Sequence, residues 1–583
     1  MQSCLYRKLF CYFVNRNNRI TASLYHAKER SIDEYKEDGQ RVENLHNTFL
    51  NYLQVNIMSK SNLKKYMMSL NIKTPERESF IASELRKNQL TPLDDIKQSP
   101  NNTSVTQTAS KLLPILIIID ILDKEPNNAQ FLFLLKRVDE TCSRMLCDLS
   151  FDETLILLNE LARTAPTKVM WLGFYLESIK TLRLRLSENK QSSLQIMNLL
   201  FLMSLRKTEA LLDVRYTLKY LSDFEKLSII EQCIVSIAAF KCGVKLDRQI
   251  IHIIEGTVQR NVEKLLKNQK LFVPLLKAMR HAGPSREFSL DHLSKRILEH
   301  KEKYKMSLAV PILALYAEIL QADSKVINRL VGDAFLQMRK SGSISEDNIA
   351  AEDAIRVKDI DRLLWAVSTL NHKLTHSQLL YVEKFLSDNL DAFSRYPKAF
   401  CGSLLALWIL GSKCRQIIEY CFRVQIFHPL LQNSLEDSGR LVVLLACIKI
   451  EAPTVVIPSN LIWDPNKKPL LNEYRELECI SSILKCLESQ LELSEINVDC
   501  PVNEIRIYGI SAKHETLGWL HVDLLNNYTC LCKPRKPHGL MNLKLRLIKT
   551  LGYTSILVDN IGPLKVEKVV TTIGEAIDEL MRK

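Results

Sequence analysis

The stretch LLKAMRHAGP (residues 275–284) recurs in altered form along much of the chain. In each copy bulky apolar residues surround a leucine or an alanine, and a short polar break leads into a second helical run. A period of about forty residues with two helices per unit is typical of α-solenoids, because one helical hairpin cannot bury both of its apolar faces alone. The sequence therefore predicts stacked helical hairpins over residues 111–450. The central residues of the copies are Leu161, Leu202, Ala238, Ala278, Ala317, Ala366 and Ala406.

The composition agrees with a mainly helical protein. Only 16 glycines and 19 prolines occur in 583 residues, which is too few for a turn-rich β-sandwich or barrel. The 15 cysteines are scattered through apolar stretches, as expected for free thiols in a reducing compartment. The formal net charge of +13 suits an anionic partner such as RNA, DNA or acidic lipid, although a solubilising surface would carry it equally well.

The N-terminal 110 residues differ from the repeat region. Residues 1–31 contain no acid before Glu29 and interleave arginines with apolar residues, which predicts a mitochondrial targeting presequence. Residues 32–88 read as a helical segment, and the polar tract 89–110 as a linker. No apolar run is long enough to cross a bilayer, so no transmembrane segment is expected.

The C-terminal 133 residues, from position 451 onward, have the pattern of a junction followed by a small α/β domain. Residues 451–500 hold four prolines and the strand-like TVVI, and then a helix at about 472–490. Residues 502–512, 517–532 and 554–560 read as strands because β-branched and aromatic residues alternate between turn signals. A last helix closes the domain, which is predicted to span residues 501–583.

No catalytic motif stands out. The phosphate-binding loops, the kinase motifs and the G-x-S-x-G nucleophile motif are all missing. Cys530 and Cys532 precede His538, but no second ligand pair lies at a spacing suitable for zinc, so no metal site is expected. The sequence predicts no resident cofactor.

The strongest local charge imbalance lies in the C-terminal domain, where residues 505–549 carry eight basic residues against Glu515 and Asp523. Cations on a surface that can follow a backbone are what phosphate binding needs, and exposed aromatic rings can stack on bases. We therefore expect RNA to be bound here and along a basic groove of the helical repeat. The candidate RNA-binding residues are Arg506, Lys513, Lys533, Arg535, Lys536, Lys544, Arg546, Lys549 and Tyr528.

The segment HGLMNLKLRLIKTLGY (538–553) alternates like a strand but also forms a helical stripe of leucines. As a helix it would leave Lys544, Arg546 and Lys549 on or beside its outer face. Together with HVDLLNNY (521–528) and the strand that follows, the segment resembles the RAP domain of the FAST kinase domain-containing family. The residues that carry the resemblance are Gly539, Leu543, Arg546, Leu547, Leu551, Gly552 and Tyr553.

This resemblance implies an RNA-binding factor of the mitochondrial matrix that acts in processing, stability or translation of organellar transcripts, with other mitochondrial RNA-processing proteins as partners. It also implies a fold similar to restriction endonucleases, whose chemistry needs paired carboxylates around Mg²⁺. Here His521 stands where such nucleases carry an acid, so Asp523 is only a weak catalytic candidate. Two alternatives remain open at this point, namely a metal-dependent RNA endonuclease using Asp523 and a helical scaffold for protein partners.

Overall fold

The computed structural model describes most residues from 169 to 582 and some from 135 to 161. The predicted presequence, the helical segment 32–88 and the linker 89–110 lie outside the described residues. Within the range 135–161 the described residues are 135–136, 139–140, 142–151, 154–155, 157–158 and 161. From 169 onward the gaps are residues 189–190, 222, 285–287, 343, 345–354, 433–434, 462–470 and 560–565.

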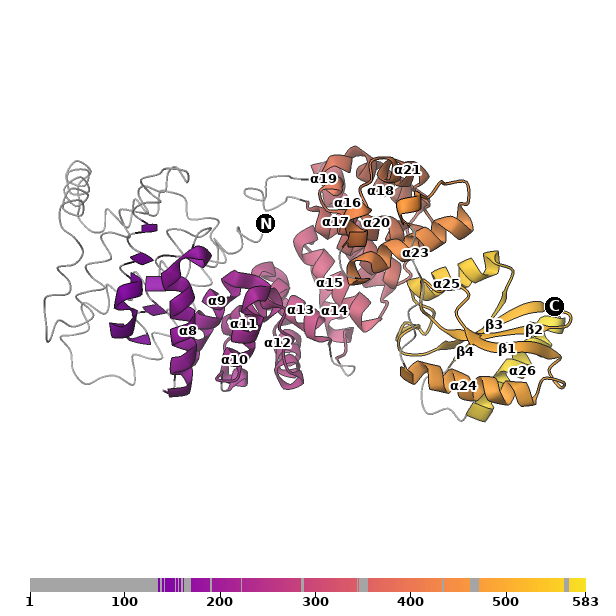
Figure 1. The fold of residues 1–583 in the computed structure, drawn as a ribbon, viewed down its shortest axis with the longest axis horizontal. Coiled ribbons are helices and arrows are strands. Elements are labelled where there is room, and N and C mark those ends of the chain that lie inside the picture. The colour runs from indigo at the N-terminus through magenta and orange to yellow at the C-terminus, as the bar shows by residue number, and fades with distance from the viewer. Residues whose placement is uncertain are drawn as a thin grey trace, which may run out of the picture. The chain divides into compact units, whose positions relative to one another are not determined.

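The described chain is mainly helical and ends in a small four-stranded sheet with its own helices, which confirms the predicted fold class (Figure 1). It divides into two compact units, Met1–Ala282 and Gly283–Lys583. The boundary falls at the Gly-Pro pair that ends the repeat copy LLKAMRHAGP. The α/β part belongs to the second unit together with the later helices of the repeat.

The described part of the first unit is built from helices, two of which start at polar caps. Ser192 and Ser228 each accept a hydrogen bond from the backbone of the first turn, and Gln195 and Glu231 return one to the cap residue. The elements are η2 (Leu146–Asp148), η3 (Val169–Trp171), α8 (Gly173–Glu188), α9 (Ser193–Met203), η4 (Ser204–Ala210), α10 (Leu211–Leu218), η5 (Phe224–Lys226), α11 (Ile229–Cys242), α12 (Arg248–Lys267) and α13 (Gln269–Ala282).

Successive copies of the repeat stack on one another in this unit. Helix α9 packs against α11 and α11 against α13, while α10 flanks α9 and α12 flanks α13. The aligned residues Leu202, Ala238 and Ala278 lie on α9, α11 and α13, and each is at most 3% exposed. The small side chains of Ala238 and Ala278 let neighbouring helices approach closely, and the sequence period corresponds to a structural repeat in these helices.

The second unit contains the same kind of stack. Helix α15 packs against α17, α17 against α20 and α20 against α23, and these helices carry the aligned residues Ala317, Ala366 and Ala406. Its helices are α14 (Asp291–Glu299), α15 (Met306–Ile319), α16 (Ser324–Ser341), α17 (Val357–Thr369), α18 (His376–Asp388), α19 (Leu390–Ser394), α20 (Pro397–Ile409), α21 (Arg415–Arg423), α22 (His428–Gln432) and α23 (Leu435–Glu451), with η6 (Ser459–Leu461) after them.

An ion pair crosses this stack from α17 to α23. Arg440 Nη1 lies 3.0 Å from Asp361 Oδ1, and a Cβ on the intervening Gly402 of α20 would come within 2.3 Å of both side chains. Burial raises the pKa of Asp361, and the Arg440 guanidinium opposes that shift. Gly402 is therefore required by the close approach of three helices.

The α/β part, residues 471–582, is called the C-terminal module below. Strands β1, β2 and β3 are antiparallel neighbours, and β4 joins β3 in parallel, so the sheet order follows the chain. A parallel pair needs a crossover, and α25 supplies it. The elements are α24 (Leu471–Cys486), β1 (Leu493–Asp499), β2 (Gly509–His514), β3 (Gly518–Leu525), α25 (Gly539–Thr550), β4 (Thr554–Asp559) and α26 (Val566–Arg582).

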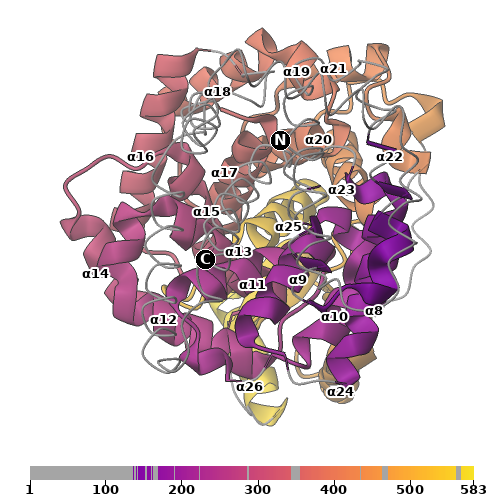
Figure 2. The ribbon, with the colours of Figure 1, turned by 90° about the vertical axis from the view of Figure 1, so that its left-hand side faces the viewer.

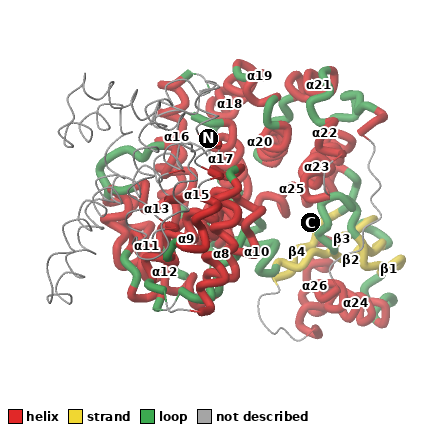
Figure 3. Tube along the Cα trace, turned by 60° about the vertical axis from the view of Figure 1, so that its left-hand side comes forward, coloured by secondary structure: helices red, strands yellow, loops and turns green. Residues whose placement is uncertain are grey.

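The two faces of the sheet are covered differently. Helices α24 and α26 pack on one face over an apolar core, while α25 lies on the other (Figures 1 and 3). Along β3 the residues Leu520, Val522 and Leu524 point into the apolar core, so His521 and Asp523 point toward α25. The α25 face of the sheet is thus the polar one, and it holds the candidate site.

Three details of the sequence prediction need correction. Residues 454–457 (TVVI) form the end of a turn and an irregular segment rather than a strand, and Pro453 and Pro458 flank them. The strand predicted over 502–512 begins only at Gly509, and β1 at residues 493–499 was not predicted. The helix over 538–553 is confirmed as α25. None of the described helices has a stretch long and apolar enough to cross a membrane.

Candidate nucleic-acid interface of the C-terminal module

A continuous chain of hydrogen bonds runs through the polar face of the sheet. Lys544 Nζ, on α25, donates to Asp523 Oδ1 and to His521 Nε2, the second at 2.9 Å. His521 Nδ1 lies 2.8 Å from Ser511 Oγ, which donates to Asp499 Oδ1 at 2.6 Å. The chain of groups therefore connects α25 with all three antiparallel strands.

The direction of each hydrogen bond in this network follows from the chemistry of lysine. An ammonium group has no acceptor, so His521 Nε2 must accept and the ring proton must lie on Nδ1. That proton is donated to Ser511 Oγ, whose own proton goes to Asp499. The tautomer of His521 that is protonated on Nδ1 therefore satisfies both of its hydrogen-bonding neighbours, Lys544 and Ser511.

Gly509 is required by this arrangement. A Cβ at this position would lie 2.5 Å from His521 Nε2 and 2.5 Å from the carbonyl oxygen of Val522. Any side chain would therefore displace the imidazole from Lys544. A glycine is needed at the start of β2 because His521 and the backbone of Val522 leave no room for a side chain there.

The network does not fit a metal-dependent nuclease. The side chains of Lys544 and Asp523 are 0% and 1% exposed, and the ammonium already holds Asp523 Oδ1. Mg²⁺ needs oxygen ligands around an accessible site, and His521 supplies nitrogen. Across the described residues no group of three or more His, Cys, Asp or Glu side chains is arranged to hold a metal ion. Lys544 neutralises Asp523 in the place where a cation would otherwise be needed.

His538 has a structural role as the N-cap of α25. Its Nδ1 accepts hydrogen bonds from the backbone N–H groups of Leu540 and Met541, at 3.1 and 3.2 Å. Burial lowers the pKa of His538, so the neutral imidazole needed for capping is favoured. The nearby Cys530 is a buried thiol that donates to the carbonyl of Leu531.

The structure corrects the placement of Lys544. The helical stripe was expected to leave it on or beside the outer face, but its side chain is fully buried against the sheet. Arg546 is also engaged inside the protein. Its Nε lies 2.7 Å from Glu451 Oε1, and its Nη2 donates to the carbonyl of Trp408 at 2.8 Å. Lys544 is therefore not accessible to an RNA ligand, whereas Arg546 keeps 37% of its side chain exposed while it makes these contacts.

Arg546 instead joins the module to the helical stack. Glu451 ends α23 and is 7% exposed, and Trp408 and Ile409 end α20. A cation at the C-terminus of α20 meets the negative end of the helix dipole, and the two contacts to Glu451 form a charge-assisted pair. Trp408 Nε1 also donates to Glu451, at 2.5 Å. One arginine thus ties α25 to two helices of the repeat.

Two further contacts hold the module on the ends of the stacked helices. The backbone of Lys533 pairs with that of Gln321, and Cys532 N donates to Leu320 O at 2.7 Å, just after α15. Gly539, the first residue of α25, lies against the carbonyl of Ser368 near the end of α17. Helices α17, α20 and α23 all contact α25 (Figure 2). The module is therefore docked on the C-terminal ends of four successive stacked helices.

The other predicted RNA-binding residues are exposed, but they lie at two opposite ends of the sheet. Near the carboxyl end of β3, Lys533 lies 3.7 Å from Asp291 and Arg535 pairs with Asp559. At the amino end of β3, Lys513 lies 3.4 Å from Glu495. The exposed candidates for which the structure gives no ion pair are Arg506, Lys536 and Tyr528 at the carboxyl end, and Lys549 at the amino end.

The amino end of β3 also carries an aromatic pair. The rings of Trp519 and Tyr553 lie 5.8 Å apart, and Trp519 is 37% exposed. Lys513 is the direct β2 partner of Trp519, so the two share a face. Lys549 lies in the last turn of α25, just before Tyr553. Burial and the Asp499 carboxylate raise the pKa of Tyr553, which keeps its phenol neutral.

Sequence reasoning missed the partners of the basic residues. Glu451, Ser511 and Asp499 are ordinary polar residues in the sequence, and only the fold brings them to Arg546 and His521. One signal in the sequence could have indicated the network. His521 and Asp523 are two residues apart, so on a strand both side chains point to the same face. No model of a known protein family matches the chain, and no curated protein matches it.

Proposed function

We propose that this protein binds single-stranded RNA in mitochondria and acts in processing, stability or translation of organellar transcripts. The observation that carries the proposal is the contact between the exposed Trp519 and the half-buried Tyr553, with Lys513 next to Trp519 in the sheet and Lys549 in the last turn of α25. Exposed rings stack on unpaired bases and adjacent cations contact phosphates, the combination that single-strand binders use. The net charge of +13 and the long helical repeat support the same reading.

We favour RNA binding over RNA cleavage because Asp523 is not available to hold a metal ion. Its carboxylate is buried and held by Lys544, so an endonuclease site there would require both groups to leave their present partners. The resemblance of residues 502–583 to the RAP domain of the FAST kinase domain-containing family supports the choice of RNA as ligand. Other mitochondrial RNA-processing proteins are proposed partners on the same ground.

The proposed location predicts that residues 1–31 are sufficient for import. A reporter protein fused to these residues is expected to enter isolated mitochondria and to become resistant to added protease, since an acid-free, arginine-bearing amphipathic start is typical of presequences. Replacing Arg7, Arg16 and Arg19 by glutamate in the same reporter is the matched control and should abolish import. Import that survives this change would contradict the assignment.

The proposed RNA binding predicts a large effect of Trp519→Ala. Loss of one stacking surface costs about 1–3 kcal/mol, so affinity for a labelled single-stranded RNA should fall about tenfold. Fluorescence anisotropy with the full chain at several salt concentrations measures it. The salt dependence of affinity should stay unchanged, because the substitution removes no cation.

Trp519→Phe is the control for this experiment, since it keeps a flat ring and should retain most of the affinity. If the wild type and Trp519→Ala bound the RNA with equal affinity, the aromatic pair would not be part of the RNA-binding interface. A wild-type protein with no salt-dependent RNA affinity would overturn the proposed function and favour the protein-binding scaffold instead.

A further inference from the structure

The sheet of the C-terminal module has two edge strands, β1 and β4, and they are built differently. The register between β1 and β2 is interrupted by a bulge between Ser494 and Asn497, and Glu495 inside the bulge has a φ of 52°. Strand β1 also ends on a carboxylate, that of Asp499. A bulge and charged side chains are the devices by which an edge strand avoids pairing with another chain. The β1 edge is therefore a poor template for a further strand.

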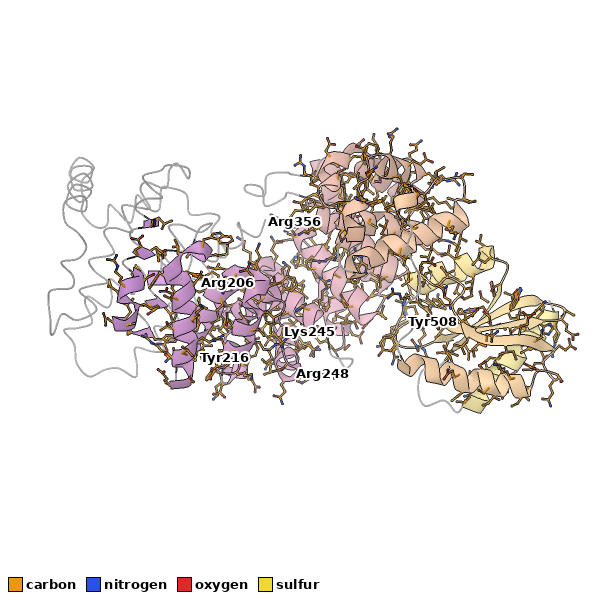
Figure 4. The ribbon with its side chains drawn as sticks, viewed as in Figure 1. Arg206, Tyr216, Lys245, Arg248, Arg356 and Tyr508 are labelled. Carbon is orange, nitrogen blue, oxygen red and sulfur yellow. The ribbon has the colours of Figure 1, made fainter. Side chains whose placement is uncertain are left out.

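Strand β4 lacks these devices. Its six residues, TSILVD (554–559), pair with β3 in an unbroken parallel register, and Asp559 is their only charged residue. Tyr508, labelled in Figure 4, directly precedes the antiparallel β2 and so marks the end of the sheet at which β4 finishes. About half of the backbone N–H and C=O groups of β4 point away from β3. Among the described residues, no backbone hydrogen bond joins these outward groups to another segment, so this edge is open to a further strand.

The side chains of β4 define what a further strand must bring. Ile556 and Val558 are 3% and 2% exposed, because they point into the apolar core beneath α24 and α26. Leu557 is the register partner of Asp523, so it lies on the α25 face of the sheet, and it is 40% exposed. The added strand must therefore cover an apolar side chain on the α25 face without placing a second carboxylate against Asp559.

We propose that β4 pairs with β4 of a second copy of this chain, antiparallel about a two-fold axis at Leu557. This register sets Leu557 against Leu557 and Ile556 against Val558. It also sets Ser555 against Asp559 of the second copy, so that a hydroxyl faces a carboxylate. A parallel pair in register would instead set Asp559 against Asp559, and like charges directly opposite each other are destabilising. A two-fold axis perpendicular to the sheet keeps both α25 faces on one side, so two four-stranded sheets join into one continuous sheet.

The dimer is expected to be weak. One pair of six-residue strands buries less than the roughly 1,600 Å² of a standard protein interface. The net charge of +13 on each copy also opposes association. A Kd in the micromolar range follows, so monomer and dimer interconvert with protein concentration. Because salt screens the repulsion between the copies, the dimer should strengthen as salt is added, whereas RNA binding should weaken.

Sedimentation velocity of the full chain without RNA tests the dimer, over about 1–100 μM so that a micromolar Kd is bracketed. The average mass should rise above the 67.1 kDa of one chain as concentration increases. Leu557→Lys places two cations opposite each other and should weaken the dimer at least about tenfold. Leu380→Lys is the matched control, because it makes the same change at a leucine of α18 that is 51% exposed. A wild type that stays monomeric over the whole range, or an equal loss in the control, would overturn the proposal.

Leu557→Cys locates the contact. The two-fold axis sets the two new thiols opposite each other, with Cα atoms about 4.5–5.5 Å apart, a separation that a disulfide bridges. After mild oxidation by oxygen, mass spectrometry should find the peptide that contains position 557 linked to itself. Ser494→Cys on β1 is the matched control and should give no such link, and the oxidised wild type shows what native exposed thiols such as Cys479 contribute. A dimer without the 557–557 link would form through another surface and would contradict the proposal.

This inference and the proposed function fail separately, because the dimer is measured without RNA. A monomeric wild type that binds RNA would overturn the inference and leave the proposed function standing. A wild type that dimerises through position 557 and binds no RNA would do the reverse.

Discussion

Replacing Lys544 by methionine is expected to destabilise the C-terminal module by about 3–5 kcal/mol, the cost of breaking a buried ion pair from one side. The change leaves the Asp523 carboxylate at 1% exposure with neither water nor a cation beside it. It also removes the hydrogen-bond donor to His521 Nε2. The proton of His521 is then no longer confined to Nδ1, so its hydrogen bond to Ser511 is no longer enforced. The effect should be local to the module.

Hydrogen–deuterium exchange of the full chain measures this effect. Peptides covering β3 and α25 should exchange much faster in Lys544→Met, while peptides of the first unit should not change. The double variant Lys544→Met/Asp523→Leu is the control, because replacing both charges with apolar groups of similar size is often neutral or stabilising. If β3 and α25 were as well protected from exchange in Lys544→Met as in the wild type, the Lys544–Asp523 ion pair would not be buried in solution.

Gly539→Ala is expected to loosen the docking of the module on the repeat. The added Cβ would lie 1.8 Å from the carbonyl oxygen of Ser368 and 3.1 Å from Ile409 Cγ2. The new methyl group would clash with the backbone of Ser368 near the end of α17. A backbone group cannot rotate away as a side chain can, so α25 must shift away from α17. Overpacking of this kind costs about 1–3 kcal/mol. The Arg546–Glu451 contact should weaken with it, because α25 carries Arg546.

Exchange of the backbone amides in α25 and in the last turns of α17 and α20 reports the loosening. Gly332→Ala is the matched control, because this helical glycine of α16 has open space around its Cβ position and the change should stabilise the helix by up to about 1 kcal/mol. Equal protection of α25 in Gly539→Ala and the wild type would mean that the module is not docked through this contact.

The helical repeat could be predicted from the sequence because its signal is local. Apolar residues at helical spacing and a central small residue recur about every forty positions, and burial of six aligned residues on successive helices follows from that pattern alone. The helix over 538–553 was predicted only with the help of the resemblance to the RAP domain, because the local alternation L-K-L-R-L fits a strand as well as a helix. By contrast, β1 was missed, since LSEINVD has two acids and only becomes a strand by pairing with β2.

The roles of the basic residues depended on the tertiary structure. The sequence by itself determined that the segment 538–553 has an apolar stripe of leucines with lysine and arginine beside it, if it is a helix. Only the fold decided that this helix is covered on both sides, by the sheet and by the ends of α17, α20 and α23. Lys544 and Arg546 therefore found their partners 21 and 95 residues away, while Lys549 in the last turn stayed exposed. A buried cation must be paired, and which distant carboxylate pairs with it is set by how the chain packs.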